Sequence, residues 1–315
     1  MKKLIPLLLL SFVSLDWTVM ARPPVSPVRV VMNGFVADKV IAGSVTAVAT
    51  KSDILSLETT GFADLEKKTT MPPDAMFWIA SMTKPMAAVC VLQLQETGKL
   101  SIDDPVEKHL PEFAGQWMTE SRAKGKLTLK KPARAITIRD LLTHTSGLAN
   151  TNSPRAESTL AELTMAYSKT PLQFEPGSRW SYSNAGINVL GRIVEVVSGT
   201  PFAEFLQARV LNPCGMKDTT FWPMPAQAKR IATSYRPGRD GQLERTEVYF
   251  LKGGLSNRKR TPYPAGGLYS TAADVVRFYQ MMLNGGTFKG QRVLKKETAA
   301  LMTRTQTGDI KTGFV

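Results

Sequence analysis

The chain has 315 residues, of which 43% are hydrophobic and 21% charged, and its formal net charge is +14. This composition is that of an ordinary globular protein with a sizeable core, which excludes a disordered or fibrous chain. Basic residues gather at 122–134 and 258–260, without interleaved aromatic residues or a nucleic-acid-binding motif. We therefore predict solvated basic loops and no nucleic-acid partner, with attraction to anionic cell-envelope polymers or acidic substrates as the alternative.

The first 21 residues have the pattern of a secretory signal peptide. Lys2 and Lys3 precede an apolar run from Leu4 to Val13, and a small-residue cleavage site ends at Ala21. The run is too short to span a bilayer comfortably, although an uncleaved anchor is the alternative interpretation. We expect an exported protein, periplasmic or secreted, with no stable membrane anchor after cleavage and one folded domain over residues 22–315.

Apolar periodicity and turn signals predict a mixture of strands and helices along the rest of the chain. The predicted elements are two strands paired as a hairpin at 40–49 and 54–61, and helices at 86–94, 103–110, 137–144, 185–197 and 271–282. Thr137 with Asp140, and Thr271 with Asp274, have the spacing of helix-capping pairs. A hairpin therefore precedes the first long helix.

Ser81 and Lys84 are the strongest candidates for chemistry. They precede the apolar run 86–94, and Pro85 is tolerated only in the first turn of a helix. Residues three apart share one face of a helix, or of a tight 3₁₀ turn, so the Lys84 amine can reach the Ser81 hydroxyl. Burial and the positive end of the helix dipole would both lower the lysine pKa. The pair is therefore a possible nucleophile and base, with the Ser81 N–H available to an oxyanion.

Three downstream side chains could belong to the same site. Tyr182 could relay protons, and the amide of Asn184 could hold both a lysine and a substrate carbonyl. The alternative for Tyr182 is a side chain that only covers the core before a helix. His144 could be a general base, but the chain has no Gly-x-Ser-x-Gly elbow. We predict instead that His144 hydrogen-bonds the backbone and caps a turn.

The chain has only two cysteines, Cys90 and Cys214, and two histidines, His109 and His144. Two cysteines cannot form a disulfide framework, so we expect buried thiols and leave one bridge between them open. Neither histidine has a cysteine or a second histidine at metal-ligand spacing. We therefore predict no metal and no cofactor.

Four short motifs occur in order over most of the chain. They are Ser81-Met82-Thr83-Lys84, Leu141-Leu142-Thr143-His144-Thr145-Ser146-Gly147-Leu148, Pro176-Gly177 with Tyr182-Ser183-Asn184, and Ala265-Gly266-Gly267-Leu268-Tyr269-Ser270. Together they resemble the serine β-lactamase-related family, which includes class C β-lactamases, D-alanyl-D-alanine carboxypeptidases and family VIII esterases. Each motif is weak alone, but their order makes the combination specific.

The resemblance implies an α/β (α+β) fold, in which helices flank an antiparallel sheet and a mainly helical subdomain is inserted between its strands. It also implies roles for single residues. Ser81 matches the acylated nucleophile, Lys84 its base and Tyr182 the tyrosine that carries the proton to the leaving group. Asn184 matches the amide that orients Lys84 and the substrate.

The family's third motif, Lys-Thr-Gly or His-x-Gly on a strand beside the serine, is expected near the C-terminal end. Lys311-Thr312-Gly313 spells it, but it follows a stretch of loop composition and precedes only two residues. We expect a chance match in a truncated sequence that lacks terminal strands and a helix. Such a fragment would be poorly soluble and inactive, while a longer product of the same reading frame would be active and tolerate Lys311→Ala.

The sequence therefore predicts an exported serine hydrolase that forms an acyl-enzyme on Ser81. Its substrate could be a small ester, a β-lactam or a D-alanyl peptide of peptidoglycan, because the motifs are shared by enzymes of all three kinds. We favour the ester, since a β-lactamase must also position a deacylating water. The alternative is a non-catalytic protein that binds peptidoglycan fragments or another ligand on the same scaffold, but such a protein has no need of the intact set of side chains.

Overall fold

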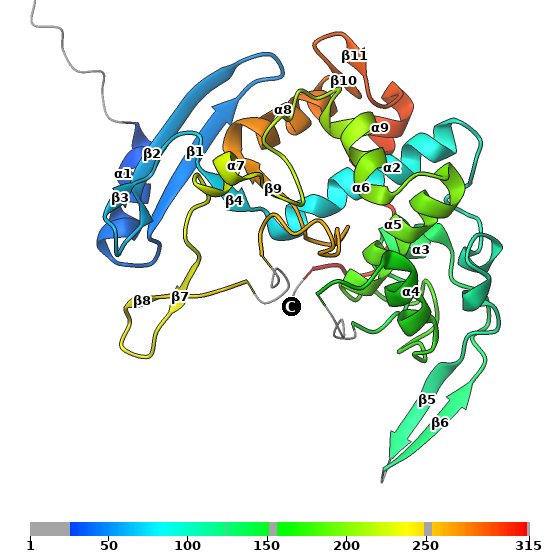
Figure 1. The fold of residues 1–315 in the computed structure, drawn as a ribbon. Coiled ribbons are helices and arrows are strands. Elements are labelled where there is room, and N and C mark those ends of the chain that lie inside the picture. Colours follow the sequence, from blue (N-terminus) through cyan, green and yellow to red (C-terminus); the bar gives the residue numbers. More distant parts are fainter. Residues whose placement is uncertain (1–25, 124, 151–155, 249–253, 314–315) are drawn as a thin grey trace, which may run out of the picture.

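The computed structural model describes residues 26–123, 125–150, 156–248 and 254–313 (Figure 1). A small antiparallel sheet lies on one side of the molecule and most of the helices gather on the other (Figure 1). This mixture of helices and antiparallel strands confirms the predicted fold class. No helix in the described ranges is long and apolar enough to cross a bilayer.

The N-terminal sheet contains the predicted hairpin. Strands β1 (Gly43–Ala49) and β2 (Ile54–Asp64) pair antiparallel, and β3 (Thr69–Thr70) adds a short third strand to β2. Helix α1 (Pro27–Ala37), which the sequence analysis did not predict, lies beside the two long strands and has no buried residue. Several apolar side chains of this region therefore remain exposed.

Helix α2 (Thr83–Glu96) follows strand β4 (Met76–Trp78) and a 3₁₀ turn, η1 (Ala80–Met82). It has ten buried residues, which agrees with its apolar sequence, and Gly98 with a φ of 70° follows its end. Strand β4 pairs antiparallel with β9 (Tyr269–Thr271), which brings a segment almost 200 residues away against the start of α2. The predicted 3₁₀ geometry before Lys84 is confirmed.

The helices on the other side surround α2 and share its core cluster. They are α3 (Ile138–Leu142), α4 (Leu160–Ser168), α5 (Asn184–Ser198), α6 (Phe202–Leu206), a π-helical turn (Gln207–Leu211), α8 (Ala272–Leu283) and α9 (Lys296–Met302). The predicted capping box of Thr137 and Asp140 opens α3. Thr271 likewise caps α8 by accepting a hydrogen bond from the Asp274 N–H.

Two predicted elements are wrong. The basic stretch at 122–134 is not a loop throughout, because β5 (Met118–Ala123) and β6 (Lys126–Lys130) form a hairpin there. The alternation of Leu127 and Leu129 with polar residues is a strand pattern that the high charge concealed. The predicted helix at 103–110 consists of a 3₁₀ turn at Val106–Lys108, followed by another at Pro111–Phe113, because Leu110 between them has a non-helical backbone.

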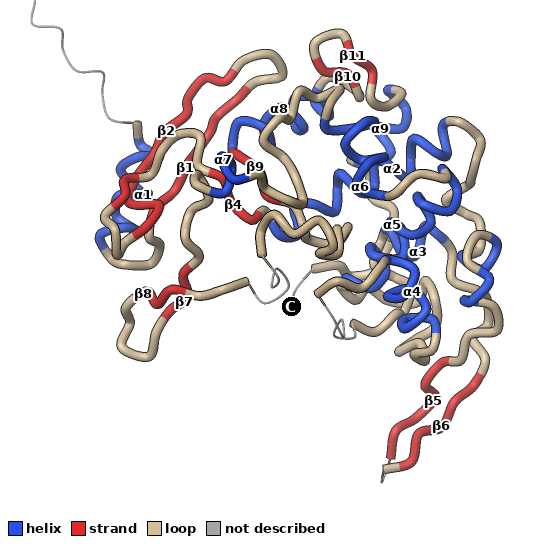
Figure 2. The backbone as a smooth tube through the Cα atoms, viewed as in Figure 1, coloured by secondary structure: helices blue, strands red, loops and turns tan. Residues whose placement is uncertain are grey.

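The remaining elements are short. One is the helix α7 (Pro225–Ala228). The others are two antiparallel ladders, β7 (Tyr235–Pro237) with β8 (Leu243–Arg245), and β10 (Thr287–Phe288) with β11 (Gln291–Arg292). Both ladders lie at the periphery of the molecule (Figure 2). Residues 303–313 contain neither helix nor strand, so Lys311 lies in a loop, as its surroundings predicted.

Candidate active site

Ser81 lies in the 3₁₀ turn that leads into α2, and its backbone is held from both sides. Ala80 before it has a φ of 47°, an uncommon conformation for a residue with a side chain. The Thr83 hydroxyl donates to the Ala80 carbonyl at 2.7 Å, and the Ile79 N–H donates to the Leu268 carbonyl at 3.0 Å. The first N–H groups of a helical turn have no acceptor within it, so the Ser81 N–H is suited to an oxyanion.

Three of the predicted site residues meet at the Ser81 hydroxyl. Lys84 Nζ donates a hydrogen bond to Ser81 Oγ at 2.9 Å, and the Tyr182 hydroxyl donates to the same oxygen at 2.7 Å. Ser81 is exposed, whereas Lys84 is only 8% exposed. A substrate can therefore reach the nucleophile, while the lysine is kept from bulk water.

The environment of Lys84 makes it a usable base. Burial lowers the pKa of Lys84 from 10.5 to about 8, because the charged amine loses hydration. Its Nζ also donates to the Ala265 carbonyl at 2.5 Å and lies 4.6 Å from the centre of the Tyr182 ring. When the amine is neutral, the Ala265 carbonyl can hold one N–H and leave the lone pair free to take the Ser81 proton.

The loop that carries the motif 265–270, to which the sequence analysis gave no role, supplies the acceptor for Lys84. The Ala265 N–H donates to the Asn188 Oδ1 of α5 at 3.1 Å, and the Trp78 indole donates to the Gly266 carbonyl at 2.5 Å. Asn188 is 4% exposed and also donates to the Tyr167 hydroxyl at 3.1 Å. A backbone carbonyl leaves no side-chain signal, but a buried amide within the apolar run of α5 could have indicated a polar partner.

His144 positions the segment that carries Tyr182. Its Nδ1 accepts a hydrogen bond from the Ser183 N–H at 3.2 Å, its carbonyl accepts from the Ser181 N–H at 2.9 Å, and its ring lies 4.6 Å from that of Tyr182. Burial and then the charge of Lys84 lower the pKa of His144 to about 4. A neutral ring that accepts at Nδ1 matches this value. The predicted structural role of His144 is confirmed.

Asn184, the fourth predicted site residue, takes no part in the hydrogen bonds that the structure describes at the Ser81 hydroxyl. It is the first residue of α5 and is exposed, and its backbone N–H donates to Asn150 Oδ1 at 2.7 Å. Among the described residues, the Asn184 amide makes no hydrogen bond to Lys84. The role of Asn184 in orienting a substrate stays a prediction. Asn150, which the sequence analysis did not single out, also donates to the Tyr182 carbonyl at 2.9 Å. Its side chain therefore holds the segment 182–184 from both its ends.

Cys90 and Cys214 are not linked by a disulfide. Cys90 lies within α2 and Cys214 after the π-helical turn, and both are free, buried thiols. Burial raises the pKa of Cys214 to about 12 and raises the pKa of Cys90 further still. The expected buried thiols are confirmed, and the bridge that the sequence left open does not form.

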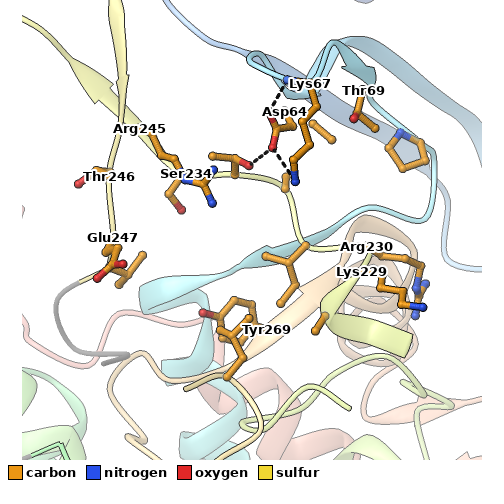
Figure 3. A pocket seen from close by; sticks show the side chains of 18 of the residues that line it. Asp64, Lys67, Thr69, Lys229, Arg230, Ser234, Arg245, Thr246, Glu247 and Tyr269 are labelled. Carbon is orange, nitrogen blue, oxygen red and sulfur yellow. Dashed lines mark hydrogen bonds and ion pairs between the residues drawn. The ribbon is translucent and has the colours of Figure 1, made fainter. Parts of the chain in front are cut away.

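A separate cavity of about 640 Å³ lies between the N-terminal sheet and β9 (Figure 3). Asp64 on its wall accepts hydrogen bonds from the Lys67 N–H at 2.9 Å and the Thr233 hydroxyl at 3.2 Å, and Tyr269 forms part of another wall. The Lys67 backbone bond is the main cause of the lowered pKa of Asp64. Ser81, Lys84 and Tyr182 do not line this cavity, and Asp64 is already satisfied within the fold.

Comparison with known proteins agrees with this geometry. The family model described as Beta-lactamase matches residues 28–314, so the chain belongs to the β-lactamase family. Esterase EstB of Burkholderia gladioli is 34% identical in an alignment 270 residues long that covers 75% of this chain and 64% of EstB. Penicillin-binding protein 4 of Amycolatopsis lactamdurans is 32% identical in an alignment 243 residues long that covers 76% of this chain and 59% of that protein.

The structure has the fold of β-lactamases and penicillin-binding proteins. It superposes on EstCE1, described as a hydrolase with promiscuous acyltransferase activity, with a TM-score of 0.73 and 27% identity over 88% of this chain and 76% of EstCE1. By the coverages given above, the chain spans about three fifths of the length of EstB and of penicillin-binding protein 4.

Proposed function

We propose that this protein is an exported serine hydrolase that cleaves an ester through an acyl-enzyme on Ser81. The observation that carries the proposal is the exposed Ser81 hydroxyl, which is hydrogen-bonded to both the buried Lys84 amine and the Tyr182 hydroxyl. Lys84 takes the Ser81 proton as Ser81 Oγ attacks the carbonyl carbon. The bond from the carbonyl carbon to the alcohol oxygen then breaks; Tyr182, bonded to the same Ser81 oxygen, gives its proton to the departing alcohol and takes the proton held by Lys84 in its place. The acyl group stays on Ser81 until water releases it as the acid.

Two further observations support the chemistry. A lysine pKa of about 8 leaves about a tenth of the amine neutral at pH 7, whereas an unperturbed lysine would be less than about a thousandth neutral. The similarity to an esterase supports an ester as substrate, and the similarity to a penicillin-binding protein keeps β-lactams and D-alanyl peptides as competing substrates. Export rests on the signal-peptide pattern of residues 1–21.

The test compares substrates and variants in the full-length protein. We expect hydrolysis of p-nitrophenyl esters of short acids to exceed cephalosporin hydrolysis, and Ser81→Ala to abolish it without unfolding the protein. Ser52→Ala, which changes an exposed serine in the turn between β1 and β2, is the matched control. Faster turnover of cephalosporins than of esters would reverse the choice of substrate, and ester hydrolysis that persists in Ser81→Ala would remove the nucleophile.

A further inference from the structure

The β5–β6 hairpin projects from the body of the molecule, beyond the helices that surround α2 (Figure 1). Its base is held firmly. Met118 is 3% exposed, the Thr119 N–H donates to the Leu172 carbonyl at 2.8 Å, and the Leu172 N–H donates to the Trp117 carbonyl at 2.8 Å. The hairpin is therefore an element whose base the fold fixes in place and whose two strands extend away from the core.

One face of this hairpin combines apolar and basic side chains. Residues opposite each other in an antiparallel pair point to the same face, and Arg122 lies opposite Leu127 while Thr119 lies opposite Leu129. Lys131 follows Leu129 by two positions, and its Nζ lies 3.8 Å from the centre of the Trp117 ring. We call the side formed by Trp117, Arg122, Leu127, Leu129 and Lys131 the hairpin face.

The apolar members of the hairpin face are exposed to water. Trp117 is 49% exposed, Leu127 41% and Leu129 37%. The cationic side chains of the hairpin face are Arg122 and Lys131, and the Lys131 Nζ also donates to the Gly115 carbonyl at 2.5 Å. Lys126 and Lys130 lie opposite Ala123 and Met118, on the other face, where the Lys130 Nζ is 3.9 Å from Glu175. Exposed tryptophan and leucine among basic residues are typical of segments that lie at the surface of a membrane, where an aromatic ring sits at headgroup level.

We propose that the hairpin face binds the surface of an anionic lipid bilayer. Trp117, Leu127 and Leu129 enter the boundary between headgroups and acyl chains, and the two cations of the same face, Arg122 and Lys131, contact anionic headgroups. A soluble anionic polymer would be bound by the charges alone and gives no role to the exposed leucines. A second copy of this face would place cations against cations, which disfavours self-association.

The molecule contains a comparison for this proposal. The β1–β2 hairpin also exposes leucines, with Leu55 at 66% and Leu57 at 38%, but the charged side chains nearest to them in sequence are Asp53 and Glu58. Similar apolar exposure without the cations should bind an anionic surface poorly, because anionic headgroups repel carboxylates. Leu55 and Leu57 are therefore the matched control positions for Leu127 and Leu129.

The experiment measures co-sedimentation of the full-length protein with phosphatidylcholine vesicles, with and without phosphatidylglycerol. We expect binding that requires phosphatidylglycerol and weakens with salt. Leu127→Ser combined with Leu129→Ser should bind about tenfold more weakly, and Arg122→Ser roughly fivefold more weakly. Leu55→Ser combined with Leu57→Ser should bind as the unchanged protein does. All four proteins share one N-terminus, so any lipid affinity of residues 1–21 cancels in the comparison.

Several results would overturn the proposal. One is equal loss of vesicle binding in both leucine pairs, and another is retention of full binding in the Leu127 and Leu129 variant. If the Leu127 and Leu129 variant also bound a soluble polyanion such as heparin more weakly, by the same factor as it binds vesicles, the face would be assigned to a polymer. If gel filtration showed that the Leu127 and Leu129 variant has a smaller oligomeric state than the unchanged protein, the face would be assigned to a second copy. Thermal melting of each variant confirms that it is folded.

Discussion

Helices α1 and α2 are both rich in apolar residues, yet α2 is buried in the core and α1 lies exposed at the surface. Ten residues of α2 are buried, and none of α1 is. Helix α2 lies among α5, α6 and the π-helical turn, whereas the main contacts of α1 are with strands β1 and β2. The difference shows that apolar content alone does not fix an element in the core, because burial depends on which partners the rest of the chain supplies.

This difference matters for chemistry. Lys84 is buried because α2 is, and Ser81 is exposed because it stands at the end of α2 where the packing stops. A lysine on α1 would keep its hydration and its high pKa. The predictions below therefore compare changes around α2 with matched changes on the exposed side, in order of decreasing effect.

Replacement of the lysine should have the largest effect. Lys84→Ala removes the base for Ser81, and we expect ester hydrolysis in the full-length protein to fall by about 10³-fold, toward the upper part of the range for general-base catalysis. Lys51→Ala, at an exposed lysine between β1 and β2, should leave the rate unchanged. Equal rates for the two variants would mean that Lys84 does not act in the reaction.

Loss of the tyrosine hydroxyl should have the next largest effect. Tyr182→Phe keeps the ring that packs against His144 but removes the 2.7 Å bond to Ser81, so kcat should fall about 10²-fold. Tyr279→Phe, at an exposed tyrosine of α8, is the control. A normal kcat in Tyr182→Phe would leave that residue with a packing role alone.

The pH dependence of the rate should report the lowered lysine pKa. The charged amine cannot accept the Ser81 proton, so kcat/KM for an ester should rise about tenfold per pH unit and level off above pH 8. His144, with a pKa of about 4, stays neutral over this range and adds no second limb. A profile that levels off near pH 6.5, the ordinary value for histidine, would point to an imidazole base instead.

A side chain in the packed helical part should contribute more to the free energy of unfolding than one on the exposed helix α1. Leu190 of α5 is fully buried, and Leu190→Ala should lower the free energy of unfolding by about 3 kcal/mol through loss of contacts and a cavity. Val31 of α1 is 57% exposed, and Val31→Ala should change it by less than about 0.5 kcal/mol. Chemical denaturation of both variants gives the comparison, and similar losses would show that α1 is buried in solution.

The features that were predictable from the sequence are local ones. The spacing of Ser81 and Lys84, the β1–β2 hairpin and the cap at Thr137 follow from short-range rules of helix and strand geometry. The β5–β6 hairpin was missed because charge was given more weight than alternation. The proximity of Tyr182 to Ser81 was inferred from the family resemblance, since a contact between residues 101 positions apart leaves no local signal.

The least predictable part of the site is its support. The Ala265 carbonyl that accepts from Lys84 is a backbone group, and its position depends on the buried amide of Asn188 in another helix. No rule of spacing connects these three residues. The role of Asn184 in orienting Lys84 and the substrate was predicted from the chemistry of its amide and from the resemblance. In the described residues Asn184 is exposed and makes no hydrogen bond to Lys84, so this role stays a prediction.

The central claim is that Ser81 is the nucleophile, and trapping the covalent intermediate tests it most directly. The full-length protein would be treated with a fluorophosphonate, digested, and the modified peptide sequenced by mass spectrometry. We predict one label, on Ser81, which Lys84→Ala slows and Ser81→Ala abolishes. A label on another residue, or undiminished labelling of the Ser81→Ala protein, would contradict the account.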